Sequence, residues 1–223
     1  MFTGIIETIG VIRSVEQRGG NQRCWIDSAD LDLALVRLGD SIAVNGVCLT
    51  VVERDGHGFA ADVSNETLSC TTLSSLRPAS RVNIEQALLP TTRLGGHLVS
   101  GHVDAVGRVV ALQPDGGSTR LGIDIPEPLR RYVAVKGSVC VDGTSLTVNR
   151  ISASGFEANI IPHTMVKTVI GDYRPGVDVN IEVDLIARYL ERLLSGPDAG
   201  RGYQDVSHEF LVQHGYIATS EDI

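Results

Sequence analysis

The stretch Gly101-His102-Val103-Asp104 is a near-copy of Gly4-Ile5-Ile6-Glu7, and the residue numbers of the two stretches differ by 97. The same difference relates two longer pairs of segments without a gap, Asn45–Val51 with Asp142–Val148 and Arg81–Glu85 with Asp178–Glu182. A period of 97 residues is longer than the ~20–50 residues of solenoid and propeller repeats. The chain is therefore predicted to hold one domain twice, with about 90 residues in each copy.

Composition narrows the class of protein. Hydrophobic residues make up 43% of the 223 residues but aromatic residues only 4%, so we expect a core of Val, Ile, Leu and Ala. The net charge of −8 and the lack of a basic run argue against nucleic acid or an anionic membrane as partner. No apolar run approaches the ~18 residues of a membrane span, and the N-terminus does not read as a secretory signal. The four cysteines lack CxxC spacing, so we expect free thiols and a cytoplasmic location.

Motifs for nucleotides and metals are absent from the sequence. There is no GxGxxG after a predicted strand, no GxxxxGK[ST] and no HExxH. His97 and His102 are five residues apart, which on a strand would place them on opposite faces. We therefore expect neither a metal nor a bound dinucleotide, and no cofactor is predicted.

Short segments rich in Val and Ile, separated by glycine turns, predict a mostly β fold. In the first copy we expect strands at 4–18, 22–28, 41–44, 48–53, 59–64 and 81–87, a helix at 31–38, and a helical start to 66–76. In the second copy we expect strands at about 99–112, 118–125, 156–161 and 178–184, a helix at 127–133 and a helical turn near His163. Asn45-Gly46 and Asp142-Gly143 are hairpin turns in these patterns. Six short strands in each copy suggest a small antiparallel barrel.

The repeat ends at Asp184, and the residues after it have no counterpart in the first copy. Leu185–Leu194 has the apolar spacing of an amphipathic helix with a wide apolar stripe. This stripe is either an oligomer contact or a face that packs on its own barrel. The expected domains are residues 1–96, 97–186 and 187–223, and the tail from Ser195 carries no readable function.

Differences between the copies point to unequal chemistry in two similar pockets. When the two copies are aligned, Cys48 corresponds to Ser145, Ile5 to His102, Ala87 to Asp184, and Gly39 to Lys136. Small polar residues are shared, namely Thr50 with Thr147, Ser41 with Ser138, and Thr67 with Thr164. These are either hydrogen-bonding groups of a ligand pocket or turn residues and helix caps. One reading is a donor pocket and an acceptor pocket.

Several motifs together resemble the riboflavin synthase family, whose members carry two lumazine-binding repeats. The motifs are Met1–Glu7, Asn45–Val51, Gly95–His102, Asp142–Val148 and Ile161–Thr164, and the resemblance covers about residues 1–195. It implies two tandem six-stranded Greek-key barrels and a homotrimer held by C-terminal helices. It also implies an active site between the N-barrel of one chain and the C-barrel of a neighbour.

The reaction implied by the resemblance is a dismutation without a cofactor. Two molecules of 6,7-dimethyl-8-ribityllumazine exchange a four-carbon unit and give riboflavin and 5-amino-6-ribitylaminouracil, the last step of riboflavin biosynthesis. A duplicated pocket suits this task, because holding both reactants can contribute up to ~7–11 kcal/mol in favourable cases. Two substrate molecules per site and lumazine synthase are the implied partners, with no nucleic acid and no membrane.

The resemblance also assigns pocket residues by position. The N-barrel pocket would be lined by Gly4, Ile5, Ile6, Cys48, Leu49, Thr50, Asp62, Val63, Ser64, Asn65, Glu66 and Thr67. The C-barrel pocket would be lined by Gly101, His102, Val103, Lys136, Ser145, Leu146, Thr147, Ile161, Pro162, His163, Thr164, Met165 and Val166.

Roles can be suggested from the chemistry of the substrate. The C7 methyl group of the lumazine is acidic, so a base and hydrogen-bond donors to the ring can start the reaction. His102, Ser145 and Thr147 are the candidates for proton transfer and orientation. Cys48 and Ser41 would act on the partner substrate, where water or the thiolate adds to the ring. Asp184 and Lys136 are expected to order the site, and which residue is the base stays open.

Three other functions are compatible with the sequence. A lumazine-carrying fluorescent protein would share the double barrel but hold one chromophore, although the combination of Cys48, His102, Lys136, Ser145 and Asp184 favours an enzyme. A structural double barrel would use the polar residues only as turns and caps. A flavin-reductase barrel would require a nicotinamide-binding domain, for which the sequence has no motif.

Overall fold

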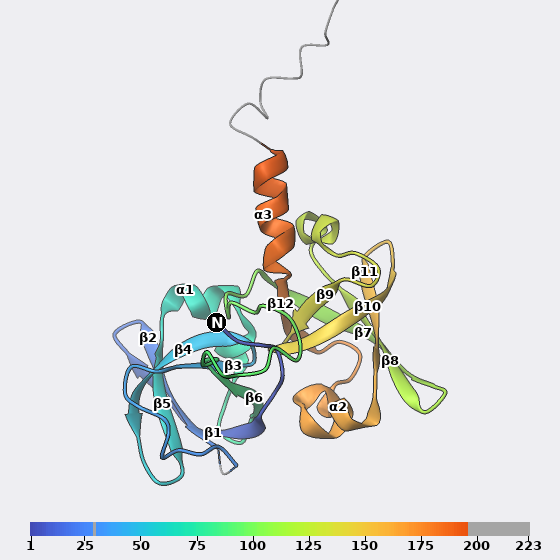
Figure 1. The fold of residues 1–223 in the computed structure, drawn as a ribbon. Coiled ribbons are helices and arrows are strands. Elements are labelled where there is room, and N and C mark those ends of the chain that lie inside the picture. Colours follow the sequence, from blue (N-terminus) through green and yellow to red (C-terminus); the bar gives the residue numbers. More distant parts are fainter. Residues whose placement is uncertain (29, 196–223) are drawn as a thin grey trace, which may run out of the picture. The chain divides into compact units, whose positions relative to one another are not determined.

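Two closed β-barrels form the body of the protein (Figure 1). The computed structural model describes residues 1–28 and 30–195. Strand order is β1-β2-β5-β4-β3-β6 in the first barrel, and β10-β11-β8-β7-β12-β9 in the second. Read in the other direction from β7, the second order is β7-β8-β11-β10-β9-β12, which is the first order with six added to each number. The predicted pair of six-stranded antiparallel barrels with one topology is confirmed.

The elements of the two copies match closely in length. The first barrel consists of β1 (Thr8–Arg18), β2 (Asn21–Asp27), β3 (Ser41–Val44), β4 (Val47–Arg54), β5 (Gly58–Val63) and β6 (Arg81–Gln86), with α1 (Asn65–Cys70) and the 3-10 helix η1 (Thr72–Ser75). The second consists of β7 (Ala105–Asp115), β8 (Ser118–Asp124), β9 (Ser138–Val141), β10 (Thr144–Ile151), β11 (Gly155–Ile160) and β12 (Asp178–Val183), with η2 (Glu127–Tyr132), α2 (Pro162–Lys167) and η3 (Val169–Asp172).

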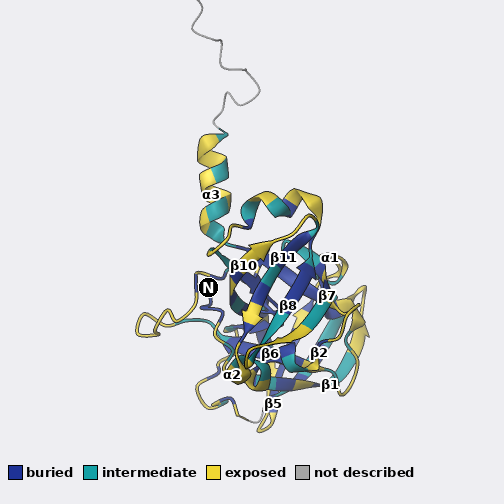
Figure 2. Ribbon diagram, turned by 90° about the vertical axis from the view of Figure 1, so that its right-hand side faces the viewer, coloured by how far each residue is buried: buried dark blue, intermediate teal, exposed yellow. Residues whose placement is uncertain are grey.

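Each barrel has its own core, and Figure 2 shows the buried residues along the strands. Phe59 and Phe156 are fully buried at equivalent positions, surrounded mainly by Val, Ile and Leu as the composition predicted. Strand alternation follows from this packing, since apolar side chains take the inner face and polar ones the outer face. All four cysteines, Cys24, Cys48, Cys70 and Cys140, are free thiols.

The β3–β4 hairpin and its copy turn at Asn45-Gly46 and Asp142-Gly143. Both residues of each turn have positive φ, at 46° and 75° in the first hairpin and 42° and 81° in the second. These are the dihedral angles of a two-residue turn that favours Asn-Gly and Asp-Gly. The predicted hairpins are therefore confirmed.

Two buried asparagines connect the barrels. The Asn83 side-chain amide donates to the carbonyl of Asp142 at 2.8 Å and its oxygen accepts from the Val169 amide at 2.8 Å. The Asn180 side chain does the same in reverse, donating to the Asn45 carbonyl and accepting from the Thr72 amide, both at 2.8 Å. Each asparagine thus forms hydrogen bonds with a carbonyl of the hairpin turn and with an amide at a helix start of the opposite barrel.

The C-terminal helix α3 (Leu185–Leu194) has the bounds predicted from the sequence. Its N-terminus is capped by Asp184, whose Oδ1 accepts from the Ile186 amide at 3.0 Å. Apolar side chains along the helix are exposed, with Leu190 at 53% and Leu193 at 77%. The tail from residue 196 lies outside the described residues.

Two predictions of secondary structure are wrong. Residues 31–38 form turns rather than a helix, because Asp32 accepts from the Ala34 amide at 3.1 Å and Asp40 accepts from the Arg37 amide at 2.8 Å. Such local side-chain bonds compete with helical ones. The segments 4–7 and 99–104 are also not strands, apart from one bridge between Phe2 and Val99, so strands start later than predicted at Thr8 and Ala105. The expected helix at 127–133 is the 3-10 helix η2.

Candidate functional site

The segment that begins the first copy lies against the second barrel. The Ser145 amide at the start of β10 donates to the Gly4 carbonyl at 2.7 Å. Gly4 has φ of 75°, and a Cβ atom there would lie 2.6 Å from the Ser145 Cβ, so only glycine fits. We call the contact of Gly4, Gly96, His97 and Ser145 the Ser145 junction.

The reciprocal contact places the second copy's segment on the first barrel. The Cys48 amide on β4 donates to the Gly101 carbonyl at 2.9 Å. Gly101 has φ of 82°, and a Cβ atom there would lie 2.6 Å from the Cys48 Cβ. We call the contact of Gly101 and Cys48 the Cys48 junction.

These junctions correct the grouping of the predicted pocket residues. The family resemblance implied that Gly4 lines the pocket of Cys48, and that Gly101 lines the pocket of Ser145. In the structure Gly4 meets Ser145 and Gly101 meets Cys48. The first segment of each copy therefore contacts the barrel of the other copy. These segments are loops held by hydrogen bonds and are not strands of their own barrel. Sequence alignment of the copies cannot reveal such an exchange, because both arrangements keep the offset of 97.

His97 is a site residue that the sequence reasoning missed. Its Nδ1 lies 2.6 Å from the Ser145 hydroxyl, while its Nε2 is buried with no hydrogen-bond partner in the described part of the chain. The residue is 8% exposed. Burial lowers the pKa of His97 below 6.5, and nearby Asp184 opposes that shift. The imidazole is therefore neutral at pH 7. Neither His97 nor His102 lies on a strand, so the alternation argument applied to them was wrong.

Along β4 and β10 the predicted site residues alternate in direction. Leu49 and Leu146 are buried in the two barrel cores, whereas Thr50 and Thr147 are exposed on the outside. Cys48 and Ser145 are half-buried beside the junctions. The reactive side chains thus lie on the outer wall of each barrel, next to the main chain brought from the other copy.

Neighbouring strands and loops add further predicted residues. Ser41 on β3 pairs with Thr50 on β4. Lys136 is exposed and has φ of 69°, at the position where the first copy has Gly39. A lysine in this left-handed conformation costs roughly 1–2 kcal/mol, which supports a functional reason for its side chain. His102 is exposed beyond the Cys48 junction, and its amide donates to the Ser100 hydroxyl at 3.2 Å.

The segments 62–67 and 161–166 lead from the strands β5 and β11 into short helices. Ser64 caps α1 by accepting from the Thr67 amide at 3.1 Å, and the hydroxyls of Ser64 and Thr67 lie 2.9 Å apart. The capping residue is thus Ser64, not Thr67. Asp62 forms an ion pair with Arg23 at 2.6 Å, which lowers the pKa of Asp62. In the second copy Ile161 and Val166 are exposed, as is Ile5 in the exchanged segment.

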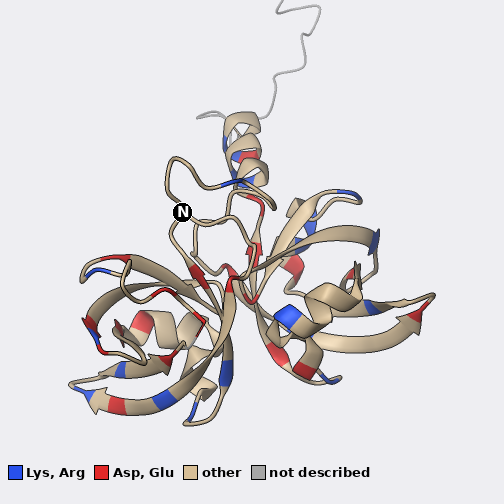
Figure 3. Ribbon diagram, turned by 60° about the horizontal axis from the view of Figure 1, so that its bottom comes forward, with Lys and Arg blue, Asp and Glu red and all other residues tan. Residues whose placement is uncertain are grey.

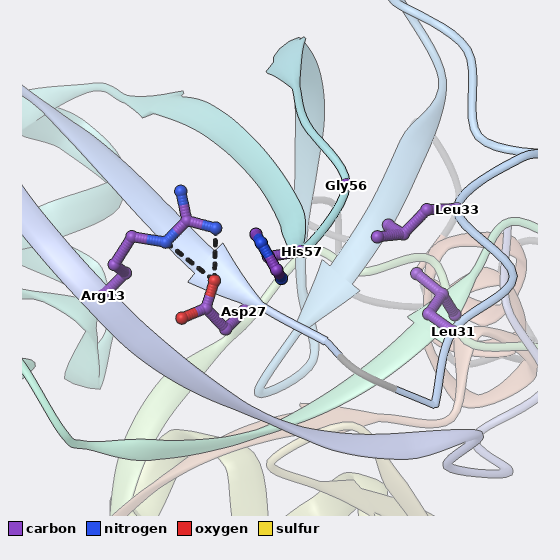
Figure 4. A pocket seen from close by; sticks show the side chains of 6 residues that line it. All are labelled: Arg13, Asp27, Leu31, Leu33, Gly56 and His57. Atoms are coloured by element: carbon purple, nitrogen blue, oxygen red, sulfur yellow. Dashed lines mark hydrogen bonds and ion pairs between the residues drawn. The ribbon is translucent and has the colours of Figure 1, made fainter.

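A separate cavity of about 680 Å³ lies elsewhere on the first barrel (Figure 4). It is lined by Arg13, Asp27, Leu31, Leu33, Gly56 and His57. The Arg13 guanidinium bonds Asp27 and, at 2.7 Å, Asp55, so its charge is already compensated. The cavity contains no residue singled out from the sequence.

Charged side chains of both signs occur on both barrels. Figure 3 shows Lys and Arg interspersed with Asp and Glu along the strands and loops. Residues 1–28 and 30–195 contain no group of three or more His, Cys, Asp or Glu side chains placed to hold a metal ion. They also contain no helix that is long and apolar enough to cross a membrane.

Comparison with protein families identifies the repeat. The family described as "Lumazine binding domain" matches twice, at residues 3–87 and 100–184. A riboflavin synthase of Photobacterium phosphoreum is 45% identical over 217 residues, covering 97% of this chain and all of the relative. A riboflavin synthase of Bacillus subtilis is 37% identical, with coverage of 97% and 100%.

Solved structures agree with the fold. LumP in complex with 6,7-dimethyl-8-(1'-D-ribityl) lumazine matches with a TM-score of 0.74 and 26% identity, covering 82% of this chain and 99% of that one. LumP in complex with riboflavin matches with a TM-score of 0.76 at the same identity and coverage. The relatives that are 37% and 45% identical are both riboflavin synthases.

Proposed function

This chain belongs to the riboflavin synthase family, and from that premise we propose how its two barrels divide the reaction between them. The activity is the dismutation of two 6,7-dimethyl-8-ribityllumazine molecules into riboflavin and 5-amino-6-ribitylaminouracil. One substrate gives four carbons to the other. The two products together contain all atoms of two substrate molecules, so no outside oxidant or group donor is required.

The observation that carries this division is the chemical inequality of the two junctions. Both junctions have the same backbone geometry, but one presents the Ser145 hydroxyl with His97 and the other presents the Cys48 thiol. Two similar sites suit two copies of one substrate, and unequal side chains suit a donor and an acceptor. Because both substrate molecules are bound beforehand, the entropy cost of bringing them together arises on binding and does not add to the barrier of the chemical step.

At the Ser145 junction we place proton transfer. The neutral imidazole of His97 can take the proton of the Ser145 hydroxyl or share it, which makes Ser145 a better acceptor for a substrate proton. Thr147 and Lys136 would bind ring oxygens and stabilise the charge that forms when the C7 methyl group loses its proton. Asp184, which caps α3, raises the pKa of His97 through its charge and would stabilise the imidazolium that forms when His97 takes up a proton.

At the Cys48 junction we place the acceptor substrate. Cys48 with Ser41 and Thr50 would direct the addition of a nucleophile to its ring, and His102 would serve proton transfer from the exposed segment. The main chain would supply the contacts assigned to Leu49 and Leu146, because their side chains are buried in the cores. Segments 62–67 and 161–166 would close the two sites.

We extend the proposal to assembly and location. The exposed apolar side chains of α3 support a homotrimer, in which the Cys48 junction of one chain would face the Ser145 junction of a neighbour. We retain residues 1–96, 97–186 and 187–223 as functional divisions, a cytoplasmic location, and lumazine synthase as a candidate partner.

The direct test is turnover by the purified chain. The protein, freed of flavin and incubated with 6,7-dimethyl-8-ribityllumazine in a chelating buffer, should produce riboflavin, detected by visible absorbance. Chromatography should show the two products in equal amounts. Tight binding of the lumazine without product would contradict the enzymatic function and favour a chromophore-carrying protein.

A further inference from the structure

Glu85 on β6 holds the segment that enters the Ser145 junction. One carboxylate oxygen accepts from both the amide and the hydroxyl of Thr3, each at 2.6 Å. The other oxygen accepts from the Gly4 amide at 3.0 Å. The Thr3 hydroxyl in turn accepts from the Ile5 amide at 3.2 Å. Three residues of the segment are thus fixed by one buried side chain.

Glu182 on β12 repeats this arrangement at the Cys48 junction. It accepts from the Ser100 amide at 2.6 Å, the Ser100 hydroxyl at 2.7 Å and the Gly101 amide at 3.0 Å. The Ser100 hydroxyl accepts from the His102 amide at 3.2 Å. The same donors and nearly the same distances therefore occur in both copies, although the residues after the glycines differ.

A core packing role does not account for these glutamates. Both are at most 4% exposed, and burying a carboxyl group is unfavourable unless it is fully hydrogen-bonded. Burial raises the pKa of Glu85 and of Glu182, and the hydrogen bonds from the segments oppose that rise. The bonds are made to residues whose carbonyls then reach the opposite barrel, at the Ser145 amide and the Cys48 amide.

We propose that Glu85 and Glu182 are positioning residues that act across the barrels. Glu85, in the first barrel, sets the geometry around Ser145 of the second, and Glu182, in the second barrel, sets the geometry around Cys48 of the first. Each carboxylate also fixes the direction of the next residue, which is Ile5 in one copy and His102 in the other. The proposal rests on the function proposed above for these two junctions.

The crossed dependence can be measured without substrate. In Glu85→Gln the amide oxygen can replace one carboxylate oxygen, but its NH₂ group then faces a main-chain donor. Loss of one such bond should speed hydrogen exchange at the Ser145 amide by about tenfold, with the Cys48 amide unchanged. Glu182→Gln should give the opposite pattern. Faster exchange at the amide of the variant's own barrel, or equal changes at both, would overturn the proposal.

Milder variants keep the test open where the glutamine variants fail to fold. Thr3→Val removes the hydroxyl and should loosen only the Ser145 amide, while Thr3→Ser, the residue that the second copy uses, should retain its protection. Ser100→Ala should loosen only the Cys48 amide, and Ser100→Thr should retain it. If the serine and valine variants at position 3 exchange alike, the hydroxyl does not position the segment.

Kinetics then separates positioning from stability. Glu85→Gln and Glu182→Gln should lower kcat more than they raise KM while the thermal midpoints of the two variants shift alike. An inactive wild-type chain would refute the proposed function but leave the exchange result valid. An active wild-type chain, with glutamate variants that do not speed hydrogen exchange in the opposite barrel, would refute only the role of the glutamates.

Discussion

Ser145 and Cys48 occupy the same position of a repeated strand, yet their neighbours differ in one decisive respect. The His97 ring lies 2.6 Å from the Ser145 hydroxyl, whereas Cys48 meets the main chain of Gly101. A histidine that is kept neutral by burial, with one nitrogen on a hydroxyl, has the arrangement of a general base. Its Nε2 is buried without a partner among the described residues.

Replacing His97 should therefore affect the reaction more than the fold. In His97→Asn the amide can still bond Ser145 but cannot take up a proton, so kcat should fall by about 10²–10⁴-fold. The wild-type rate should decline only as the pH falls below 6.5, because the pKa of His97 is lowered, and this acid limb should vanish in the variant. Steady-state rates from pH 5 to 8 measure both. His57→Asn, an exposed histidine of the other cavity, is the control and should keep the wild-type profile.

Asp142 presents a second case in which the copies differ, since Asn45 takes its place in the first hairpin. Its carboxyl accepts from the Tyr173 hydroxyl at 2.6 Å and from the Asn180 amide at 2.7 Å, yet burial raises its pKa from 3.8 to about 7. Between pH 3.8 and about 7, Asp142 therefore keeps its proton in the folded chain but loses it in the unfolded chain. The contribution to stability is present below pH 3.8 and is lost as the pH rises through 7.

The variant Asp142→Asn should remove that pH dependence. At pH 4 its free energy of unfolding should be close to that of the wild type, and at pH 8 it should be higher by an amount on the order of 4 kcal/mol. Urea unfolding at the two pH values measures the difference. The reverse change, Asn45→Asp, should introduce a pH dependence of the same sign in the first barrel. Equal unfolding curves for wild type and Asp142→Asn at pH 8 would contradict this account.

Among the secondary-structure elements, α3 is the clearest success of sequence reasoning, and 31–38 is the clearest failure. Both have helical apolar spacing. In 31–38 the aspartates bond nearby amides, so turns replace the helix. In α3, Asp184 instead caps the first turn, and the helix continues to Leu194. The positions of capping side chains, more than apolar spacing, separate the two cases.

The exposed apolar stripe of α3 leads to a prediction about assembly. Leu190→Asp combined with Leu193→Asp should convert the trimer proposed above to monomers and abolish activity, because each proposed site would lose the neighbouring chain's half. Light scattering gives the mass and the riboflavin assay gives the rate. Arg192→Gln changes the same helix without touching the stripe and should remain trimeric. A fully active monomer would refute the site between chains.

For the whole molecule, the hydrogen bonds of Asn83 and Asn180 to the opposite barrel lead to a prediction about how the barrels unfold. Asn83→Asp keeps the acceptor for the Val169 amide but turns the donor toward the Asp142 carbonyl into a second acceptor. An unsatisfied buried group costs about 1–3 kcal/mol or more when charged. Calorimetry should show one transition in the wild type, and an earlier or divided transition in the variant. Asn149→Asp, at an exposed position, should behave as the wild type does.

Local patterns in the chain were sufficient for the barrels and for the family. Alternating Val and Ile, the Asn-Gly and Asp-Gly turns and the repeated motifs each depend on residues close in sequence, and the unequal residues Cys48, Ser145, His102 and Lys136 could be read by aligning the copies. The crossing of the first segments, the pairing of His97 with Ser145 and the anchoring by Glu85 and Glu182 depend on residues 48 to 141 positions apart. No periodicity records such contacts, because they arise only when two closed barrels pack and each needs the other's main chain to satisfy its buried polar groups.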